Sequence, residues 1–204
     1  MLIAFLRHGS NGALIAGVLA LALWAAAGGP ALGPGWIVLG ALLFYASEYG
    51  WHRFAFHASP SSRPLVLRLQ RRLHYDHHAE PGRLDLLFLP FWFLAPVLAA
   101  NALLFWLIFG AGAVAPMVFG VCLAILHYEW THYVAHIPYR PRTAWGRFIK
   151  HYHLRHHFIS EKFWFGVSNP SFDVLWRTAP DPKTVTKSPY VRNLFGDRAT
   201  DGLK

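Results

Sequence analysis

Residues 111–136 read AGAVAPMVFGVCLAILHYEWTHYVAH and join a membrane-spanning pattern to a metal-binding pattern. The part from Ala111 to about Trp130 is apolar except near its end, and it has roughly the 20 residues that a transmembrane helix needs. His132 and His136 follow at once, and residues four apart share one face of a helix. The stretch therefore predicts a membrane helix that presents two imidazoles at one of its ends.

Three more apolar blocks precede this one, at residues 11–29, 35–51 and 84–109. The chain of 204 residues is 54% hydrophobic and only 14% charged, whereas soluble domains are about a quarter charged. We therefore expect an all-α integral membrane protein with four transmembrane helices and a cytosolic helical cap that carries the histidines. The first block can alternatively be a cleaved signal peptide that ends in the small residues Ala25 and Ala27, but we favour a span.

A single membrane domain is expected to occupy residues 1–178. Residues 179–204 are rich in Pro, Thr and Lys and predict an extended surface tail with little regular order. Gly110 and Gly112 predict a very tight turn between the third and fourth blocks. Cys122 is the only cysteine, so the sequence has no internal disulfide and no cysteine-based zinc motif; we expect it to be a small buried residue.

The basic residues predict the orientation in the membrane. The link 52–83 contains six arginines and the segment after Thr131 holds most of the remaining basic residues, whereas the links 28–34 and 110–112 have none. The positive-inside rule places the first link and the C-terminal segment on the cytoplasmic side. A net charge of +9 is also typical of nucleic-acid binding, but these charges flank apolar blocks, as juxtamembrane charges do. We expect membrane lipid as the partner and no nucleic acid.

Most of the 13 histidines form four tight groups on this predicted cytoplasmic side. Spacings of three and four residues aim the imidazoles of one group at one point, and neutral imidazole is a good transition-metal ligand. Because one ion takes about four to six ligands, ten grouped histidines predict two metal ions. His8, His127 and His151 lie outside the groups and are not expected to be ligands. The ten predicted ligands are His52 and His57 (HRFAFH), His74, His77 and His78 (HYDHH), His132 and His136 (HYVAH), and His153, His156 and His157 (HLRHH).

The size and setting of this site favour oxygen chemistry on two non-haem iron ions. Zinc has no redox chemistry, and a zinc hydrolase needs three protein ligands and an open position. An apolar substrate can slide from the bilayer into a site at the ends of the spans without entering water. Zinc can displace iron in purified protein, since it lies higher in the usual affinity order. Glu48, Asp76 and Glu129 lie within four residues of predicted ligands and are candidates to hydrogen bond their outer ring nitrogens.

The four histidine motifs in this order, HRFAFH, HYDHH, EWTHYVAH and HYHLRHHF, followed by FGVSNPSFDVLW, resemble the fatty acid hydroxylase superfamily and within it the fatty acid 2-hydroxylase branch. The resemblance covers roughly residues 48–177. It implies a four-span membrane protein whose ten motif histidines bind a di-iron centre that inserts one oxygen atom from O2 into a lipid C–H bond. Eukaryotic members often carry a fused haem-binding cytochrome domain. This sequence has no room for one, so we expect a separate electron-donor protein, and a basic cytoplasmic face suits an acidic donor.

Two other functions stay open at this point. The first is another reaction of the same superfamily, such as carotenoid ring hydroxylation, sterol oxidation or desaturation, since carotene hydroxylases share similar four-motif patterns. The second is a non-catalytic metal-binding membrane protein for storage or transport. Transport is disfavoured because a transporter needs ionisable residues near mid-membrane, whereas these histidines lie at one end of the spans. Neither Asn169 nor Asp173 receives a role from the sequence.

Overall fold

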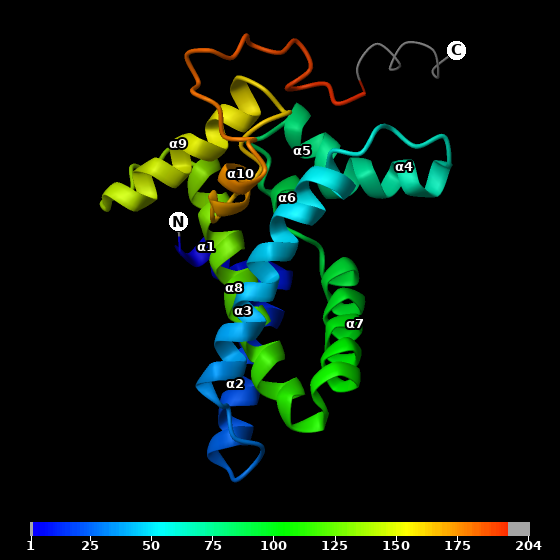
Figure 1. Ribbon diagram of the computed structural model, residues 1–204, viewed down its shortest axis with the longest axis vertical. Coiled ribbons are helices and arrows are strands. Elements are labelled where there is room, and N and C mark those ends of the chain that lie inside the picture. The colour runs from blue at the N-terminus through cyan, green and yellow to red at the C-terminus, as the bar shows by residue number, and fades with distance from the viewer. Residues whose placement is uncertain (1, 196–204) are drawn as a thin grey trace. The chain divides into compact units, whose positions relative to one another are not determined.

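This computed structural model describes residues 2–195, and the regular elements in that range are all helices. The chain divides into two compact units. One comprises Met1–Ser47 and Leu89–Trp130, and the other comprises Glu48–Phe88 and Thr131–Lys204. Helices α3 (Pro34–Gly50) and α8 (Ala111–His136), labelled in Figure 1, both contribute residues to the two units.

The first unit consists of apolar helices packed around one hydrophobic core. Besides parts of α3 and α8, it contains α1 (Leu2–Arg7), α2 (Gly9–Ala26) and α7 (Phe91–Phe109). Cys122 is buried in its core, as predicted. The buried core residues come from α2, α7 and α8: Leu14, Leu94, Phe105, Ala113, Met117, Val121, Cys122 and Ile125.

Helices α3 and α8 approach each other backbone to backbone. A Cβ added to Gly40 would lie 2.2 Å from the carbonyl oxygen of Met117, and one added to Gly120 would lie 2.0 Å from that of Ile37. No real Cβ tolerates such a distance, so both positions require glycine while the helices stay this close. Small residues at crossing points are typical of helix packing in membranes, where close van der Waals contact drives association.

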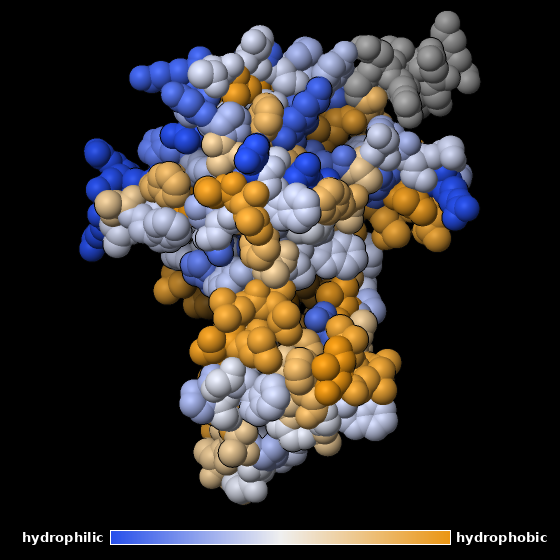
Figure 2. Space-filling model, in the orientation of Figure 1, coloured by the Kyte–Doolittle hydropathy of each residue, from blue (hydrophilic) through white to orange (hydrophobic). Residues whose placement is uncertain are grey.

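Within residues 2–195, three stretches are long and apolar enough to cross a membrane: Gly9–Ala26, Leu84–Phe109 and Ala111–His136. Their outer faces expose large apolar side chains, such as Leu107 on α7, and much of the surface over α3 and α7 is hydrophobic (Figure 2). An isolated soluble domain would leave this surface in contact with water at a large free-energy cost. The chain is therefore described as a multi-pass membrane protein. The second predicted span corresponds to α3, which has 17 residues, and its role as a span stays a prediction.

The structure changes the third and fourth predicted blocks in detail. Residues 84–109 do not form one helix, because α6 (Leu84–Leu87) ends before Pro90 and α7 begins after it. A residue that precedes proline is pushed out of the helical region, which explains the break. Helix α8 continues past the predicted end near residue 130 to His136. The predicted tight turn is confirmed, since Gly110 alone joins α7 to α8 with a φ of 82°.

The second unit consists of short helices that carry the histidines. The longest helix that lies wholly in this unit is α9 (Ala144–Phe158), and Thr143 caps its N-terminus by accepting a hydrogen bond from the Gly146 amide at 3.0 Å. The Lys150 ammonium in that helix donates to three backbone carbonyls at and beyond the end of α8, at distances of 2.7–3.0 Å. Besides the ends of α3 and α8 and the short α6, the elements are η1 (Trp51–Phe56, π-helical), α4 (Pro64–Gln70), η2 (Arg71–Tyr75, π-helical), α5 (Asp76–Ala79), α9 (Ala144–Phe158) and α10 (Ser171–Leu175).

Candidate metal centre

The ten predicted histidines converge into two groups of five within the second unit. In each group, one ring nitrogen of every member lies within 4.8 Å of those of the others. The motifs HYDHH and HLRHH are both divided between the groups, which the sequence did not predict. The first group is His52, His57, His74, His78 and His156, and the second group is His77, His132, His136, His153 and His157.

The Nε2 atoms inside each group are close enough to share one ion. In the first group, His57 Nε2 lies 2.8 Å from that of His74 and 2.9 Å from that of His156. In the second group, the Nε2 atoms of His77 and His132 are 3.0 Å apart. Two nitrogens bound at about 2.0–2.1 Å to one metal at a right angle would be about 3 Å apart, so these spacings fit neighbouring ligands. Five nitrogens also exceed the four of a tetrahedral zinc site.

The two groups lie next to each other. The rings of His78 in the first group and His157 in the second group are stacked with their centroids 4.1 Å apart. Consecutive residues also contribute to different groups, since His77 and His78 face opposite groups, as do His156 and His157. Neighbouring groups of this kind can hold two ions as one dimetal centre.

A π-helical turn explains how His52 and His57 join the same group. Residues five apart on an α-helix point about 140° away from each other, so the sequence spacing alone argues against a shared target. In the structure, residues 51–56 form a π-helix, and the His57 amide donates to the His52 carbonyl at 3.1 Å, an i to i+5 bond. The wider turn brings both rings to one side. Such π turns are rare and occur frequently at functional sites.

Backbone carbonyls orient three rings of the first group through their other nitrogens. The Nδ1 atoms of His78 and His156 donate to the carbonyls of Val191 and Phe163 at 2.8 and 2.7 Å. His52 Nδ1 likewise donates to the Phe165 carbonyl. A hydrogen on Nδ1 leaves the lone pair on Nε2, which is the atom that faces the centre of the group.

The protonation chemistry of the rings also fits a metal centre. Burial lowers the pKa of His52 to about 4 and that of His78 to about 3, so both rings are neutral at physiological pH. His157 is fully buried, and neither of its ring nitrogens has a hydrogen-bond partner among the residues that the structure describes. A buried imidazole without a partner is costly unless something else binds it, and a metal ion at Nε2 would do so.

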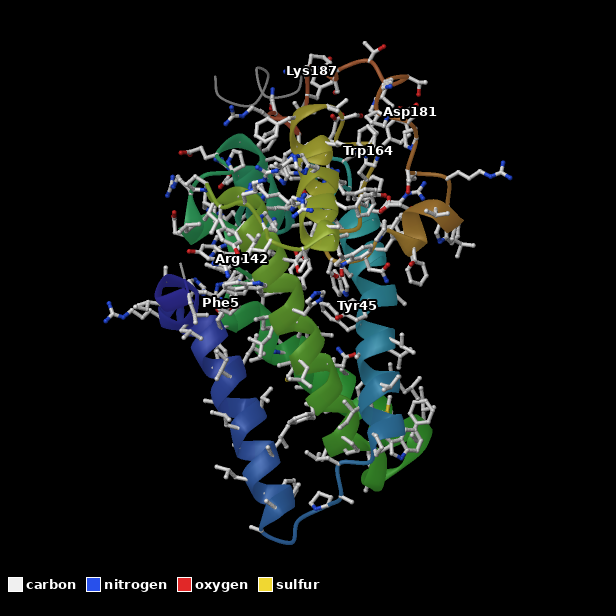
Figure 3. The ribbon with its side chains drawn as sticks, turned by 90° about the vertical axis from the view of Figure 1, so that its left-hand side faces the viewer. Phe5, Tyr45, Arg142, Trp164, Asp181 and Lys187 are labelled. Atoms are coloured by element: carbon white, nitrogen blue, oxygen red, sulfur yellow. The ribbon has the colours of Figure 1, made fainter. Side chains whose placement is uncertain are left out.

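The loop 163–168, which supplies two of these carbonyls, is held by two buried carboxylates. Glu48 Oε1 accepts hydrogen bonds from the amides of Val167 and Ser168 at 2.7 and 2.9 Å, and Glu48 Oε2 accepts one from the Ser168 hydroxyl. Asp173 accepts from the amides of Phe165 and Gly166 at 2.9 and 2.6 Å and from the Thr178 hydroxyl at 2.7 Å. The fully buried Trp164 ties the same loop to the segment that leads to Asp181, since its indole donates to the Pro180 carbonyl (Figure 3).

The three carboxylates proposed from the sequence thus have different positions. Glu48 holds the loop 163–168 through the amides of Val167 and Ser168, and its contact with a ligand stays a prediction. Asp76 forms a partly exposed ion pair with Arg71 at 3.1 Å. Glu129 is fully buried in the first unit and accepts a hydrogen bond from the Leu89 amide at 3.0 Å; its contact with a ligand stays a prediction.

The histidines left out of the predicted ligand set also lie outside both groups. His127 pairs with the Tyr45 hydroxyl at 3.0 Å, and His151 Nδ1 donates to the Arg147 carbonyl at 2.6 Å. Asp173, to which the sequence assigned no role, is fully buried. Its position two residues after an N-P-S turn gave no signal of its contacts, which depend on the folded loop.

A cavity of about 450 Å³ lies beside the first group. His57 forms part of its wall, together with the basic residues Arg53 and Lys162. Tyr190 and Phe195 from the C-terminal segment form another part of the wall. The wall of this cavity thus combines a histidine of the first group, two basic side chains and several apolar ones.

Known proteins share both the sequence pattern and the fold. A family model described as fatty acid hydroxylase matches residues 37–178. A fatty acid 2-hydroxylase of Rattus norvegicus is 32% identical over 159 residues, which cover 73% of this chain and 41% of that protein. A dihydroceramide fatty acyl 2-hydroxylase of Arabidopsis thaliana is 33% identical over 164 residues, covering 74% and 63% respectively. The chain therefore spans about two fifths of the animal relative's length and less than two thirds of the plant relative's.

The fold matches a solved structure as well. The hydroxylase domain visible in a structure of full-length scs7p superposes with a TM-score of 0.69 at 22% identity. The match covers 87% of this chain and 66% of that one. At this identity the likeness concerns the fold.

Proposed function

Because the chain belongs to the fatty acid hydroxylase family, we propose that it is a di-iron, O2-dependent membrane hydroxylase that inserts oxygen into a C–H bond of a fatty acyl chain or related lipid. The observation that carries this proposal is the pair of adjacent five-histidine groups with inward-facing nitrogens. The relatives named as fatty acid 2-hydroxylases favour attack on an acyl chain over attack on a carotenoid or sterol ring.

We assign the ligands of the two ions to the two groups. His52, His57, His74, His78 and His156 would hold one ion, and His77, His132, His136, His153 and His157 the other. Bound iron would supply the activation of O2 and the insertion of one oxygen atom, which is cofactor chemistry that side chains cannot perform. The second oxygen atom would leave as water, which would take two electrons and two protons from outside the centre.

The protein's own residues would orient and shield this chemistry. The carbonyls of Phe163, Phe165 and Val191 fix the rings of the first group, and buried surroundings keep bulk water away from both groups. Glu48 and Asp173 would act through the loop 163–168, not on the substrate. Their proposed function is to keep two of those carbonyls in place.

The proposal includes a membrane arrangement and two partners. Four helices, α2, α3, α7 and α8, would span the bilayer, with the histidine groups on the cytoplasmic face. A lipid substrate would reach the site from the bilayer, and a separate donor protein would deliver electrons. A basic cytoplasmic surface predicts an acidic donor, so turnover with the donor should slow as salt rises, and salt-independent turnover would contradict this pairing.

Lipid analysis of cells that express the chain tests the proposed activity. Wild-type protein should produce acyl species heavier by one oxygen atom, detected by mass spectrometry of total lipid extracts. The variant His132→Ala His136→Ala removes two ligands of one group and should abolish these species. His151→Ala is the matched control, because His151 lies outside both groups, and it should keep the activity.

Metal analysis separates the remaining explanations. Purified wild-type protein should contain two metal ions per chain after iron reconstitution, and the double variant should contain fewer. If the lipid extracts contain hydroxylated carotenoids or sterols but no hydroxylated acyl chains, the substrate is a carotenoid or sterol and not an acyl chain. Two bound metals with no oxidised lipid, even with an added donor and reductant, would favour a metal-binding protein without catalytic function. A wild type that binds no metal would contradict the proposal.

A further inference from the structure

The C-terminal segment Ser188–Phe195, called the strap below, contacts the first histidine group directly. The Val191 carbonyl accepts the hydrogen bond from His78 Nδ1 at 2.8 Å, although the two residues are 113 positions apart. Val191 is only 5% exposed and His78 is fully buried. The sequence predicted a surface tail from residue 179; within the strap Val191 is buried, whereas its neighbours are exposed or half-buried. Residues 196–204 of that predicted tail lie outside the described residues.

Two further hydrogen bonds attach the strap on either side of Val191. The Ser188 amide donates to the Ile159 carbonyl at 2.8 Å, just after α9 ends. The Arg192 guanidinium donates to the Ala79 carbonyl at 3.1 Å, at the end of α5. Helices α5 and α9 both carry histidines of the centre, and in the view of Figure 1 the C-terminal segment runs above both helices.

Aromatic contacts complete the attachment. The Phe195 ring packs edge-on against Tyr75 with the centroids 5.1 Å apart, and the Arg71 guanidinium lies 5.6 Å from its centroid. Tyr75 directly follows His74, another member of the first group. Tyr190 and Phe195 also form part of the cavity wall that includes His57. The strap therefore touches the surroundings of His57, His74 and His78, all members of the first group.

We propose that the strap is a positioning element for one of the two metal ions, the one held by the first group, and that it limits access to this ion through the cavity. This inference rests on the proposed function, since it requires two bound ions. Loosening the strap removes the acceptor that fixes the His78 ring and opens the cavity wall. Loss of such an outer partner typically weakens metal binding about 10- to 100-fold, so the first ion should become labile while the second is retained.

Site-selective metal release tests this proposal without reference to catalysis. Full-length protein loaded with two iron ions is exposed to excess EDTA, and the metal content per chain is followed by mass spectrometry over time. The variant Arg192→Ala Phe195→Ala removes two side-chain attachments of the strap and should release one ion about 10- to 100-fold faster than wild type. The second ion should leave at the wild-type rate. Arg192→Lys Phe195→Tyr should restore slow release, because it keeps a donor and a ring.

Matched variants exclude other causes. Lys187→Ala removes a positive charge from an exposed residue just before the strap (Figure 3) and should release both ions at wild-type rates. Combined with His132→Ala His136→Ala, which spares the first group, the strap substitutions should make the remaining ion labile. If the double strap variant does not fold, Arg192→Ala alone carries the same test.

The outcomes distinguish this inference from the function on which it rests. Fast loss of one ion with retention of the other supports the strap as a positioning element. If both ions are lost in parallel, or if the strap substitutions do not change the release rates, the inference is overturned. Neither result contradicts the proposal of a dimetal centre. A wild-type protein that holds no metal overturns the proposed function itself.

Discussion

Replacing Asp173 with asparagine tests whether the loop 163–168 orients the first histidine group. The substitution keeps the size of the side chain but exchanges one carboxylate oxygen for an NH2 group that cannot accept a hydrogen bond. The two oxygens now accept from the Phe165 and Gly166 amides at 2.9 and 2.6 Å. One of these buried amides must therefore lose its acceptor.

The expected effect follows from these contacts. An unsatisfied buried N–H group costs about 1–3 kcal/mol in the free energy of unfolding. For a protein of this size, about 2 kcal/mol lowers the midpoint of thermal unfolding by roughly 4–8 °C. Because the Phe165 carbonyl orients His52, the affinity of the first group for metal should also fall, by about tenfold or more.

Thermal unfolding in detergent and metal analysis of the same preparation measure both effects. Asp181→Asn is the matched control, since it changes an exposed aspartate outside the loop and should alter stability by less than about 0.5 kcal/mol. An Asp173→Asn protein that melts with the wild type and keeps both metals would refute the reasoning. The same melting temperature with one metal lost would limit the role of Asp173 to ligand orientation.

Three other perturbations have definite expected outcomes. Gly120→Ala should force α3 and α8 apart, because the added Cβ would lie 2.0 Å from the Ile37 carbonyl oxygen. The yield of detergent-solubilised protein and its melting temperature should both fall, and unchanged values would contradict the close crossing. Lys150→Met removes three hydrogen bonds at the end of α8 and should destabilise the protein by about 1–3 kcal/mol, whereas Lys183→Met, an exposed change, should not. Metal-free protein should lose stability in acid. Histidines of the unfolded chain bind protons below about pH 6.5, whereas burial lowers the pKa of His52 in the folded protein to about 4 and that of His78 to about 3. Each contributes a slope of about 1.4 kcal/mol per pH unit in that window and none above it, and a flat profile from pH 7 to 4 would exclude buried neutral rings.

The sequence by itself was sufficient to predict the helical class, the apolar segments and which histidines come together. These features depend on local properties of the chain: hydrophobic length, residue type and the spacing of histidines along a helix. His132 and His136 on α8 are the clearest case, because four residues make about one turn in any α-helix. The same locality made the tight turn at Gly110 predictable.

Local rules failed where neighbouring residues had to serve different targets. Helical spacing predicted that the imidazoles of each motif would converge on one point, yet His77 and His78 belong to different groups. The pairing of His52 with His57 required a π-helical turn, which no spacing rule for an α-helix anticipates. The predicted block 84–109 contains Pro90, and apolar length alone did not predict that the helix breaks there.

Tertiary structure alone decided what holds the ligands in place. The orienting acceptors are backbone carbonyls, which every residue has, so no side-chain pattern marks Phe163, Phe165 or Val191 for this role. Glu48 reaches the Ser168 amide across 120 positions, and Val191 meets His78 across 113. Contacts over such separations form only when the folded chain returns to the same place. The sequence therefore identified the candidate ligands, and the fold decided how they divide into two groups and what orients them.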